Sequence, residues 1–524
     1  MSGTISTFFR MIRTGWVLVR HDALVPTEYS AMVPWPVRAI GGLSRIFAIR
    51  GRAKNPGERF AAALEKLGPA YIKFGQILGT RADMLDPEFV KGLARLKDKV
   101  PPFPMEQAEA MLETEWGGPW TTKLESLSQP IAAASVAQVH KGVLKSGEVV
   151  AVKILRPNIV TRMNNDMAVL GMVAGLAEKF VPESRRLGPK AFVKTAGRAV
   201  MLELDLRLEA AAASELTEPG VETGFYSVPN IYWDLGGKNI LVTEWVDGKA
   251  VSDETILTDP DYDPLDIAKN VMQAFLTCSF DYGVFHADMH EGNMIVKPRG
   301  EDGKPGELVL IDFGILGRLE PREQRFHAEI LYGFLMRDYR RIAEVHFEAG
   351  YVPTHHGIDD FASALRAVGE PIFGKRAEDV PMSKVLLQLF EITDIFDMKM
   401  QPQLIMLQKT MMQAEGVCRR LDPNFDMWET ARPIVEASMR RELGVEGRVN
   451  DLLDGLDKAR RTLEKLPNAT ENIAALAQAW ADGDVDLSSA KPAAPQKQNP
   501  LRPVLYVGIG AGLALAGAFA AAHL

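Results

Sequence analysis

The segment 285–293 is Phe285-His286-Ala287-Asp288-Met289-His290-Glu291-Gly292-Asn293, and Asp312-Phe313-Gly314 follows it after the apolar run Leu308-Val309-Leu310-Ile311. An aspartate, an asparagine five residues later and a second aspartate behind a short apolar strand are the working residues of protein-kinase-like phosphoryl transfer. Any one of them alone would more often be an ordinary loop-capping residue. All three in this order favour a nucleotide site over that alternative.

The chemistry of phosphoryl transfer explains these residue types. Charge spreads over the outer oxygens of the transferred group, so the reaction needs a divalent metal held by carboxylate and amide oxygens. It also needs a carboxylate that orients the attacking hydroxyl or water. We expect Asp312 and Asn293 to hold Mg²⁺, Asp288 to act as the base, and ATP to be the nucleotide.

Two strands are expected at 131–140 and 147–155, joined at Lys145-Ser146-Gly147 as a hairpin that covers the nucleotide. The first contains an alanine version of the kinase glycine loop, A-x-A-x-x-A-x-V. Alanine resists positive φ, so this loop should be stiffer than a glycine loop. An alanine-rich buried strand is the alternative. The expected nucleotide contacts in the loop are Ala132, Ala133, Ala134, Ser135, Val136, Ala137 and Val139.

Lys153 ends the second strand, fourteen residues after Val139, where a kinase places the lysine that binds the α and β phosphates. A lysine in so apolar a strand needs a carboxylate partner. We assign Glu209, from a helical stretch expected at 201–209, to this lysine. Glu203 and Asp205 in the same stretch face different sides and are left for another role.

The apolar segment 239–248 ends in a polar turn, as expected of a hinge whose backbone contacts adenine, here at Glu244 and Val246. A buried helix is expected at 267–282. After Gly314 the extended activation segment of a protein-substrate kinase is missing, because Glu320-Pro321 begins a helix almost at once. The sequence therefore offers no evident platform for a peptide substrate.

Composition limits the function classes. At 524 residues the chain exceeds one core, and 47% hydrophobic with 24% charged residues is typical of a globular protein. Its two cysteines, Cys278 and Cys418, give neither a disulfide framework nor a zinc spacing. A net charge of −8 argues against nucleic acid as a partner, since phosphate backbones require clustered Lys and Arg.

Residues 1–55 carry most of their charge as arginine, with Phe8, Phe9 and Trp16 interleaved. This favours a basic amphipathic segment on an anionic membrane surface, with a transit peptide or an ordinary surface helix as alternatives. At the other end, 481–502 has a linker composition. Val504 to Leu524 has no charge except His523, which predicts a single transmembrane helix of about 30 Å. Lys497 and Arg502 on its amino side predict that the catalytic domain is cytoplasmic.

The chain resembles the UbiB family of atypical kinase-like ATPases, also called the aarF-domain or ADCK family, which supports ubiquinone biosynthesis. Its KxGQ motif matches Lys73-Phe74-Gly75-Gln76, followed by Thr80-Arg81-Ala82-Asp83, and its ExD motif matches Glu203-Leu204-Asp205. The resemblance covers roughly residues 30–430. It extends to the alanine loop, Lys153, Asp288 with Asn293, and Asp312-Phe313-Gly314.

The resemblance implies that the KxGQ helix folds over the place where a protein substrate would dock and that Lys73 meets Glu203 and Asp205. Lys73, Gln76, Glu203 and Asp205 are then regulatory, with Lys73 also counted among the catalytic residues beside Asp288 and Lys153. It implies ATPase activity in place of protein phosphorylation at a cell inner membrane. The implied partners are membrane lipids, polyprenyl-phenol quinone precursors, quinone-biosynthesis proteins and a second copy of the chain. Bacterial relatives often end in two membrane spans, whereas this chain has room for one.

The expected fold is α+β, a protein-kinase-like bilobal fold with a small β-rich N-lobe, a helical C-lobe, a helical KxGQ extension and a C-terminal transmembrane helix. The expected boundaries are 1–55 for the basic segment, 56–118 for the extension, 119–248 for the N-lobe, 249–480 for the C-lobe, 481–502 for the linker and 503–524 for the membrane helix. Two other functions stay open: a small-molecule phosphotransferase of the aminoglycoside or choline kinase type, and a pseudokinase scaffold.

Overall fold

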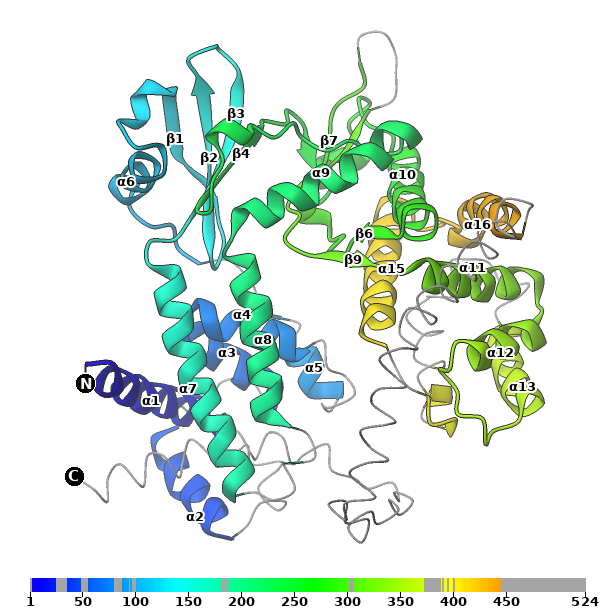
Figure 1. Ribbon diagram of the computed structural model, residues 1–524, viewed down its shortest axis with the longest axis horizontal. Helices are drawn as coiled ribbons and strands as arrows, with labels where there is room; N and C mark the ends of the chain where they lie inside the picture. Colours follow the sequence, from blue (N-terminus) through cyan, green and yellow to red (C-terminus); the bar gives the residue numbers. More distant parts are fainter. Residues whose placement is uncertain are drawn as a thin grey trace, which may run out of the picture. The chain divides into compact units, whose positions relative to one another are not determined.

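The computed structural model describes residues 2–24, 35–48, 55–79, 87–93, 95–96, 100–180, 185, 188–300, 306–371, 388, 391–393, 395–398 and 401–443. These residues form two compact units (Figure 1). Unit 1 comprises the described residues up to 211 together with 230–245. Unit 2 comprises 212–229 and the described residues from 246 onward.

Unit 1 contains a four-stranded antiparallel sheet in the order β1-β2-β3-β4. Its strands are β1 (Leu124–Ala133), β2 (Ala137–Leu144), β3 (Val149–Leu155) and β4 (Ile240–Glu244). Alternate residues of β3, Val150, Val152 and Ile154, are fully buried and belong to one core with Leu112 of α6 (Met105–Trp116). Lys153 lies between two of them in sequence and therefore on the opposite face of the sheet. Figure 1 shows α6 beside this sheet.

The strand expected at 131–140 is wrong as a single element. Residues 134–136 form a tight turn in which the Ala134 amide donates to the Ala137 carbonyl at 2.8 Å, and β1 and β2 lie on either side of it. Alanine is tolerated in turns as well as in strands, so the alternating pattern of the sequence did not reveal the turn. The alanine-rich loop therefore joins β1 to β2, while the turn at 145–148 joins β2 to β3 as expected.

The helices of unit 1 surround a second core. They are α1 (Ser2–Arg20), α2 (Trp35–Ser44), η2 (Arg45–Phe47), α3 (Pro56–Leu67), α4 (Pro69–Gly79), α5 (Pro87–Leu93), α7 (Ile159–Phe180) and α8 (Pro189–Glu203), with short turns η3 (Trp120–Thr122) and η5 (Trp233–Leu235). The break expected at Gly68-Pro69 separates α3 from α4, because Gly68 has a φ of +114°. Apolar residues of α3, α4, α7 and α8, such as Leu64, Phe74 and Val193, fill this core.

The helical stretch expected at 201–209 is two helices. Helix α8 ends at Glu203 and α9 (Leu206–Thr223) begins three residues later. The carboxylate of Asp205 accepts the Arg207 amide at 3.2 Å, the contact by which an aspartate caps a helix start. The sequence did not reveal this cap because helix propensity is favourable across the whole stretch. Glu203 and Glu209 therefore lie on separate helices and not on the single helix that the sequence suggested.

Unit 2 combines short strands with packed helices. The strands are β5 (Lys249–Ala250), β6 (Val284–His286), β7 (Met294–Val296), β8 (Leu308–Leu310) and β9 (Leu316–Arg318). They form a β5-β7-β8 sheet and a β6-β9 pair. The helices are η6 (Glu254–Leu257), α10 (Pro264–Thr277), the π-helical turn η7 (Cys278–Tyr282), η8 (Glu291–Asn293), α11 (Pro321–Met336), α12 (Tyr339–Glu348), α13 (Ile358–Gly369), α15 (Pro402–Leu421) and α16 (Met427–Leu443). Helix α10 packs against both α15 and α16.

Several expectations lie outside the described residues. They are the transmembrane helix at 503–524, the linker at 481–502, the end of the C-lobe beyond 443 and the segment Thr80 to Asp83. Within the described part of the chain, no helix combines the length and the apolar character needed to cross a membrane.

Candidate active site

The loop that carries Asp288 is fixed by its own hydrogen bonds in unit 2. It follows β6, which pairs with β9. The Asp288 amide donates to Nδ1 of His286 at 3.1 Å, and the side-chain amide of Asn293 donates to the Asp288 carbonyl at 3.1 Å. Burial lowers the pKa of His286, which keeps this imidazole neutral and able to accept at Nδ1. The base expected from sequence is thus held on a rigid loop.

Asn293 and Asp312 meet at the ends of paired strands. Asn293 is the residue directly before β7, and Asp312 lies shortly after the end of β8. The Ile311 amide donates to the Asn293 carbonyl at 2.9 Å. Asp312 has a φ of +63°, a left-handed conformation that aspartate tolerates better than most residues. The neighbouring Phe313 ring lies 5.5 Å from the His286 ring. The local hydrogen bonds and this ring contact fix where both metal-ligand candidates lie.

The donor set fits Mg²⁺. The nitrogen of the Asn293 side chain is used in its bond to Asp288, and among the described residues none donates to its amide oxygen. Asp312 adds carboxylate oxygens, one of which accepts the Gly314 amide at 3.3 Å. Hard oxygen donors from one or two side chains are what Mg²⁺ takes from proteins at nucleotide sites.

Two contacts of Asp288 were missed by sequence reasoning. On α15, Nε2 of Gln413 donates to Oδ1 of Asp288 at 3.1 Å, and Nζ of Lys409 lies 3.7 Å from the same oxygen. Both residues lie more than a hundred positions from Asp288, so no local motif connects them. Their spacing of four on one helix was the one available signal, because such residues share a helix face.

Unit 1 holds the lysine that was assigned to the phosphates. Nζ of Lys153 donates to Oε1 of Glu209 at 2.6 Å, and Glu209 is only 9% exposed. A pair at this distance is a charge-assisted hydrogen bond, which offsets much of the cost of burying either charge. The residues assigned to each other from sequence are therefore in contact. Glu209 lies on α9 and Glu203 on α8, however, and not on the single helix expected at 201–209.

Arg156, which the sequence analysis did not identify, holds the alanine-rich loop through hydrogen bonds. Its guanidinium donates to the Ala134 carbonyl through Nε at 3.1 Å and through Nη2 at 2.8 Å, and also to the carbonyls of Val100 and Pro101. The adjacent Ser135 is fully buried, and its hydroxyl has no hydrogen-bond partner among the described residues. A buried hydroxyl without a partner is costly, so this loop suits a ligand that supplies an acceptor.

The expected adenine contacts are only partly available. The Glu244 amide donates to the Asn230 carbonyl at 2.8 Å, and the Trp245 amide donates to the Val149 carbonyl at 3.1 Å. Glu244 also accepts from Asn230 through its carboxylate. Because these amides are used inside unit 1, a base would have to use other backbone groups of the segment, such as those of Val246.

Lys73 on α4 contacts one of its two expected partners. Its Nζ lies 2.8 Å from Oε2 of Glu203 at the end of α8, and both side chains are mostly buried. Asp205 is a correction: its carboxylate instead forms a bidentate pair with Arg207, at 2.8 and 2.6 Å, and this pair lowers the pKa of Asp205. The helix break after Glu203 turns Asp205 toward the start of α9. Gln76, one turn after Lys73, is half-buried.

Two family models match segments of this chain. Residues 95–346 match the family described as "ABC1 atypical kinase-like domain", and residues 365–426 match the "UbiB helical domain". A protein of Marinobacter nauticus named "Probable protein kinase UbiB" is 36% identical over 94% of this chain and 89% of its own length. A protein of the same name from Pseudomonas paraeruginosa is 38% identical over 88% of each chain.

Among solved structures, the Mycobacterium tuberculosis protein Rv3197 in complex with erythromycin covers 67% of this chain, with 20% identity and a TM-score of 0.44. The family match agrees with the α+β architecture described above, a β-rich N-lobe followed by a helical C-lobe. A kinase-like fold of this kind implies ATP binding. From its sequence matches over nearly its whole length, the chain belongs to the UbiB family of ABC1 atypical kinase-like proteins.

Proposed function

We propose that this protein uses Mg²⁺-ATP to support ubiquinone biosynthesis, acting on or beside polyprenyl-phenol precursors at a membrane. The observation that carries the proposal is the catalytic loop of unit 2. There, Asp288 is fixed through His286 and Asn293, and the Ile311 amide next to Asp312 donates to the Asn293 carbonyl. A scaffold that merely bound nucleotide would not need this arrangement.

Each residue has a role that follows from its contacts. Lys153, oriented by Glu209, binds phosphate oxygens, and the buried hydroxyl of Ser135 donates to the same ligand. Asn293 and Asp312 hold Mg²⁺, which when bound neutralises phosphate charge. Asp288 accepts the proton of the attacking hydroxyl or water, while Gln413 and Lys409 restrain its carboxylate.

The packing of the KxGQ element supports our proposal that the protein does not act on a peptide substrate. The pair between Lys73 and Glu203 joins α4 to α8, and Gly75 of the same motif lets α4 lie against Leu64 and Leu96. A Cβ at Gly75 would come within 2.5 Å of each of these side chains. The motif is therefore built for close packing, which fits a fixed cover better than a mobile substrate loop.

Two other functions remain as alternatives. A small-molecule phosphotransferase would share Asp288, Asn293 and Asp312 but would not need the element that contains Lys73. A pseudokinase scaffold would need neither the base nor the metal ligands. The close family relatives named as probable kinases favour an active enzyme over a scaffold.

The test is ATP turnover by the full chain, with and without liposomes that contain a polyprenyl phenol. We expect stimulation by the loaded liposomes and a loss of at least about a hundredfold in Asp288→Asn, the scale of general-base catalysis. Quinone content should fall in cells that carry only Asp288→Asn. Unchanged quinone content would support the scaffold, and phosphate appearing on a soluble alcohol would support the small-molecule kinase.

A membrane location is part of the proposal, and α1 supports it. Phe9, Ile12 and Trp16 recur at helical spacing and are exposed, and the Trp16 ring lies 5.7 Å from the ring of Phe47, which is also exposed. The opposite side of α1 is packed, since Thr14 is buried and within 2.7 Å of the Tyr71 hydroxyl. Exposed aromatic residues among arginines are typical of a helix in the membrane interface.

Trp16→Phe tests this location. In anionic vesicles we expect a blue-shifted component of tryptophan emission in the wild type that the variant lacks. Trp233→Phe is the matched control, because Trp233 is comparably exposed but lies on η5 away from the basic segment. Equal spectra for wild type and Trp16→Phe would show that α1 stays in water. A homodimer and binding to other quinone-biosynthesis proteins remain proposals of the same kind.

A further inference from the structure

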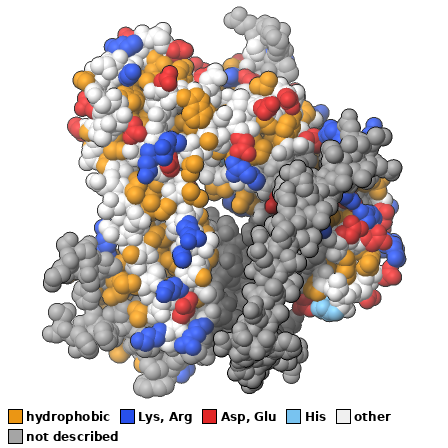
Figure 2. Space-filling view, viewed as in Figure 1, with side chains coloured by type: hydrophobic (Ala, Val, Ile, Leu, Met, Phe, Trp, Pro, Cys, Tyr) orange, Lys and Arg blue, Asp and Glu red, His pale blue; other side chains and the backbone are white. Residues whose placement is uncertain are grey.

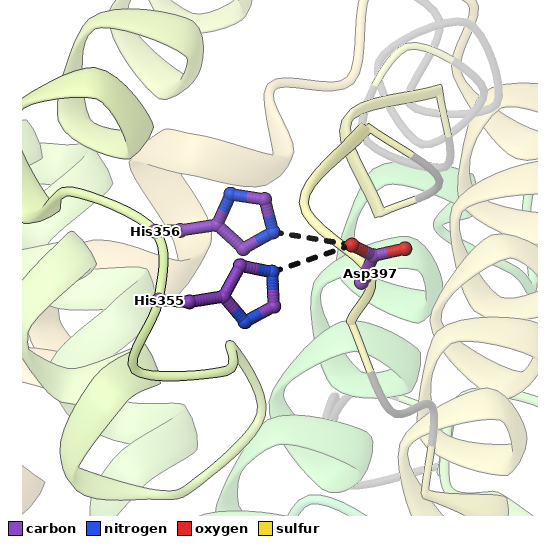
Figure 3. A group of neighbouring side chains, drawn as sticks. All are labelled: His355, His356 and Asp397. Carbon is purple, nitrogen blue, oxygen red and sulfur yellow. Dashed lines mark hydrogen bonds and ion pairs between the residues drawn. The ribbon is translucent and has the colours of Figure 1, made fainter. Parts of the chain in front are cut away.

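Two histidines and an aspartate converge at the surface of unit 2 (Figure 3). His355 and His356 precede α13, and Asp397 follows a short helical segment that contains Ile392. Nε2 of His355 lies 3.6 Å from Oδ2 of Asp397, and Nε2 of His356 lies 3.3 Å from the same oxygen. On the face shown in Figure 2, histidine side chains reach the surface at the lower right edge, in the region of α12 and α13.

We propose that His355, His356 and Asp397 bind a divalent transition-metal ion, with Zn²⁺ as the best match. Two imidazole nitrogens and one carboxylate oxygen are a common zinc ligand set, with water completing the tetrahedron. Mg²⁺ and Ca²⁺ are disfavoured because they prefer oxygen ligands throughout. The cluster is separate from the metal-ligand candidates Asn293 and Asp312.

The distances fit coordination of one ion, and the hydrogen bond between His356 and Asp397 is longer than most. Zinc bonds of about 2.0–2.2 Å to nitrogen and oxygen place two ligands of a tetrahedron about 3.3–3.6 Å apart. The two nitrogen–oxygen distances are 3.3 and 3.6 Å, and all three ligand atoms lie within 4.8 Å of one another. A hydrogen bond from an imidazole would place these atoms about 2.7–3.2 Å apart. One ion among the three atoms would need only small side-chain shifts.

The backbone and the rings orient the ligands in advance. The His356 amide donates to the Pro353 carbonyl at 3.2 Å, closing a turn that presents both imidazoles on one side, with ring centroids 4.2 Å apart. The His356 ring packs 5.2 Å from the ring of Phe396, which in turn lies 4.9 Å from that of Phe361 on α13. Buried Phe396 thus anchors the segment that carries Asp397.

Exposure indicates what kind of site this is. His355 and Asp397 are more than half exposed, whereas His356 is 21% exposed. An ion here would keep an open position filled by water and would exchange with solution. His355 and His356 lie before α13 in the sequence, and Asp397 lies after it. A bound ion would therefore link residues 395–398 to the turn before α13.

The experiment uses the full chain without a histidine tag, stripped by a chelator and kept in excess Mg²⁺ so that oxygen-rich sites are occupied. Titration with Co²⁺ should give the intense visible absorption of tetrahedral Co²⁺, which Zn²⁺ then displaces. We expect His355→Gln and Asp397→Asn each to weaken binding at least about tenfold. Asp360→Asn is the control, because Asp360 is an exposed carboxylate at the start of α13 outside the cluster.

His355→Gln keeps the test largely independent of folding, since this side chain is 66% exposed and contributes little buried surface. Zinc should also raise the thermal unfolding midpoint of the wild type and of Asp360→Asn but not of the two ligand variants. Binding that is equal in all four proteins, or a wild-type spectrum typical of octahedral Co²⁺, would overturn the proposal. In that case the three side chains form a surface contact that binds no metal ion.

Discussion

At the scale of single residues, Asp288 is held through both its backbone and its carboxylate. Its backbone is held by His286 and Asn293, and its carboxylate contacts Gln413 and Lys409 from α15. A base must point at its substrate before reaction, so restraint of this kind reduces the reorganisation that catalysis requires. From these contacts we expect the α15 residues to act as positioning residues through Asp288.

Replacing Lys409 tests this role. Lys409→Gln removes a charge 3.7 Å from the Asp288 carboxylate, and we expect kcat for ATP turnover to fall about tenfold with little change in KM for ATP. Steady-state kinetics measure both. Lys269→Gln is the control, since Lys269 is an exposed lysine on α10. A rise in KM with unchanged kcat would mean that Lys409 binds nucleotide instead of positioning the base.

At the scale of elements, the break between α8 and α9 decides which carboxylate serves which lysine. Glu203 ends α8 and contacts Lys73. Asp205 caps the start of α9 and contacts Arg207, and Glu209 one turn later contacts Lys153. The sequence assigned Glu209 to Lys153 correctly, whereas of the two acids that the family resemblance assigned to Lys73 only Glu203 contacts it. The sequence could not place the break, because the residues around it all favour helix and the cap forms only when Asp205 meets the Arg207 amide.

The ion pair between α4 and α8 predicts a charge-reversal result. Lys73→Glu should loosen the KxGQ element through like-charge repulsion with Glu203, lower the stability of unit 1 by about 1–3 kcal/mol and permit phosphate transfer to protein, including the chain itself. The double variant Lys73→Glu with Glu203→Lys should recover much of the loss. Unfolding midpoints and radiolabelled phosphate incorporation measure the two effects.

If the double variant is no better than Lys73→Glu alone, the pair does not hold the element. If neither variant allows protein phosphorylation while ATP turnover persists, the KxGQ element is structural and does not exclude protein substrates. These outcomes separate the packing of α4 from its proposed role.

The crossing of α3 and α5 predicts opposite effects for two glycine substitutions. A Cβ at Gly57 would lie 2.5 Å from the Phe89 carbonyl oxygen and 2.8 Å from its Cα, and backbone atoms cannot move aside cheaply. Gly57→Ala should therefore destabilise unit 1 by about 1–3 kcal/mol. Gly171→Ala on α7 meets nothing within 4 Å and should stabilise its helix by up to about 1 kcal/mol. Thermal unfolding midpoints distinguish the signs.

At the scale of the whole molecule, stability should depend on pH through buried histidine. His327 on α11 is 9% exposed, its Nδ1 contacts the Glu323 carbonyl, and its Nε2 has no hydrogen-bond partner among the described residues. Burial lowers the pKa of His327 from 6.5 to about 4. Protonation would place an unpartnered charge inside unit 2, so the neutral form is required.

The unfolded chain therefore binds this proton more readily than the folded one between pH 6.5 and 4. Stability from His327 is fully present above pH 6.5 and is lost as the pH falls toward 4, by about 2 kcal/mol at pH 5. In His327→Gln the loss of unfolding free energy between pH 7.5 and pH 5, measured by denaturant unfolding at both pH values, should be smaller than in the wild type by about 2 kcal/mol. An unchanged pH dependence would show that His327 is not the group that titrates.

The family match and the two units describe the chain at its largest scale. The kinase-like match spans residues 95–346 and the helical-domain match spans 365–426. Helices α3 to α5, with the KxGQ motif, precede the first match yet share a core with α7 and α8 of unit 1. The extension is thus part of the folded core of unit 1, although it lies outside the kinase-like match.

The sequence by itself determined which residues make up the candidate catalytic loop, the lysine–glutamate pair at Lys153 and Glu209, and the helical extension with its break at Gly68. These features are encoded by short spacings and by the rule that a buried charge needs a partner, both of which are readable along the chain. The first β-strand and the helix at 201–209 were misjudged because propensity is continuous where a turn or a cap interrupts the element.

Only the tertiary structure decided which distant residues meet. Lys409 and Gln413 reach Asp288 because α15 lies in unit 2 with the catalytic loop. Arg156 holds the alanine-rich loop, and His355 and His356 meet Asp397 through the packing of Phe396 on Phe361. The physical reason is that side-chain packing between elements sets these contacts, and such packing leaves no periodic trace in the sequence.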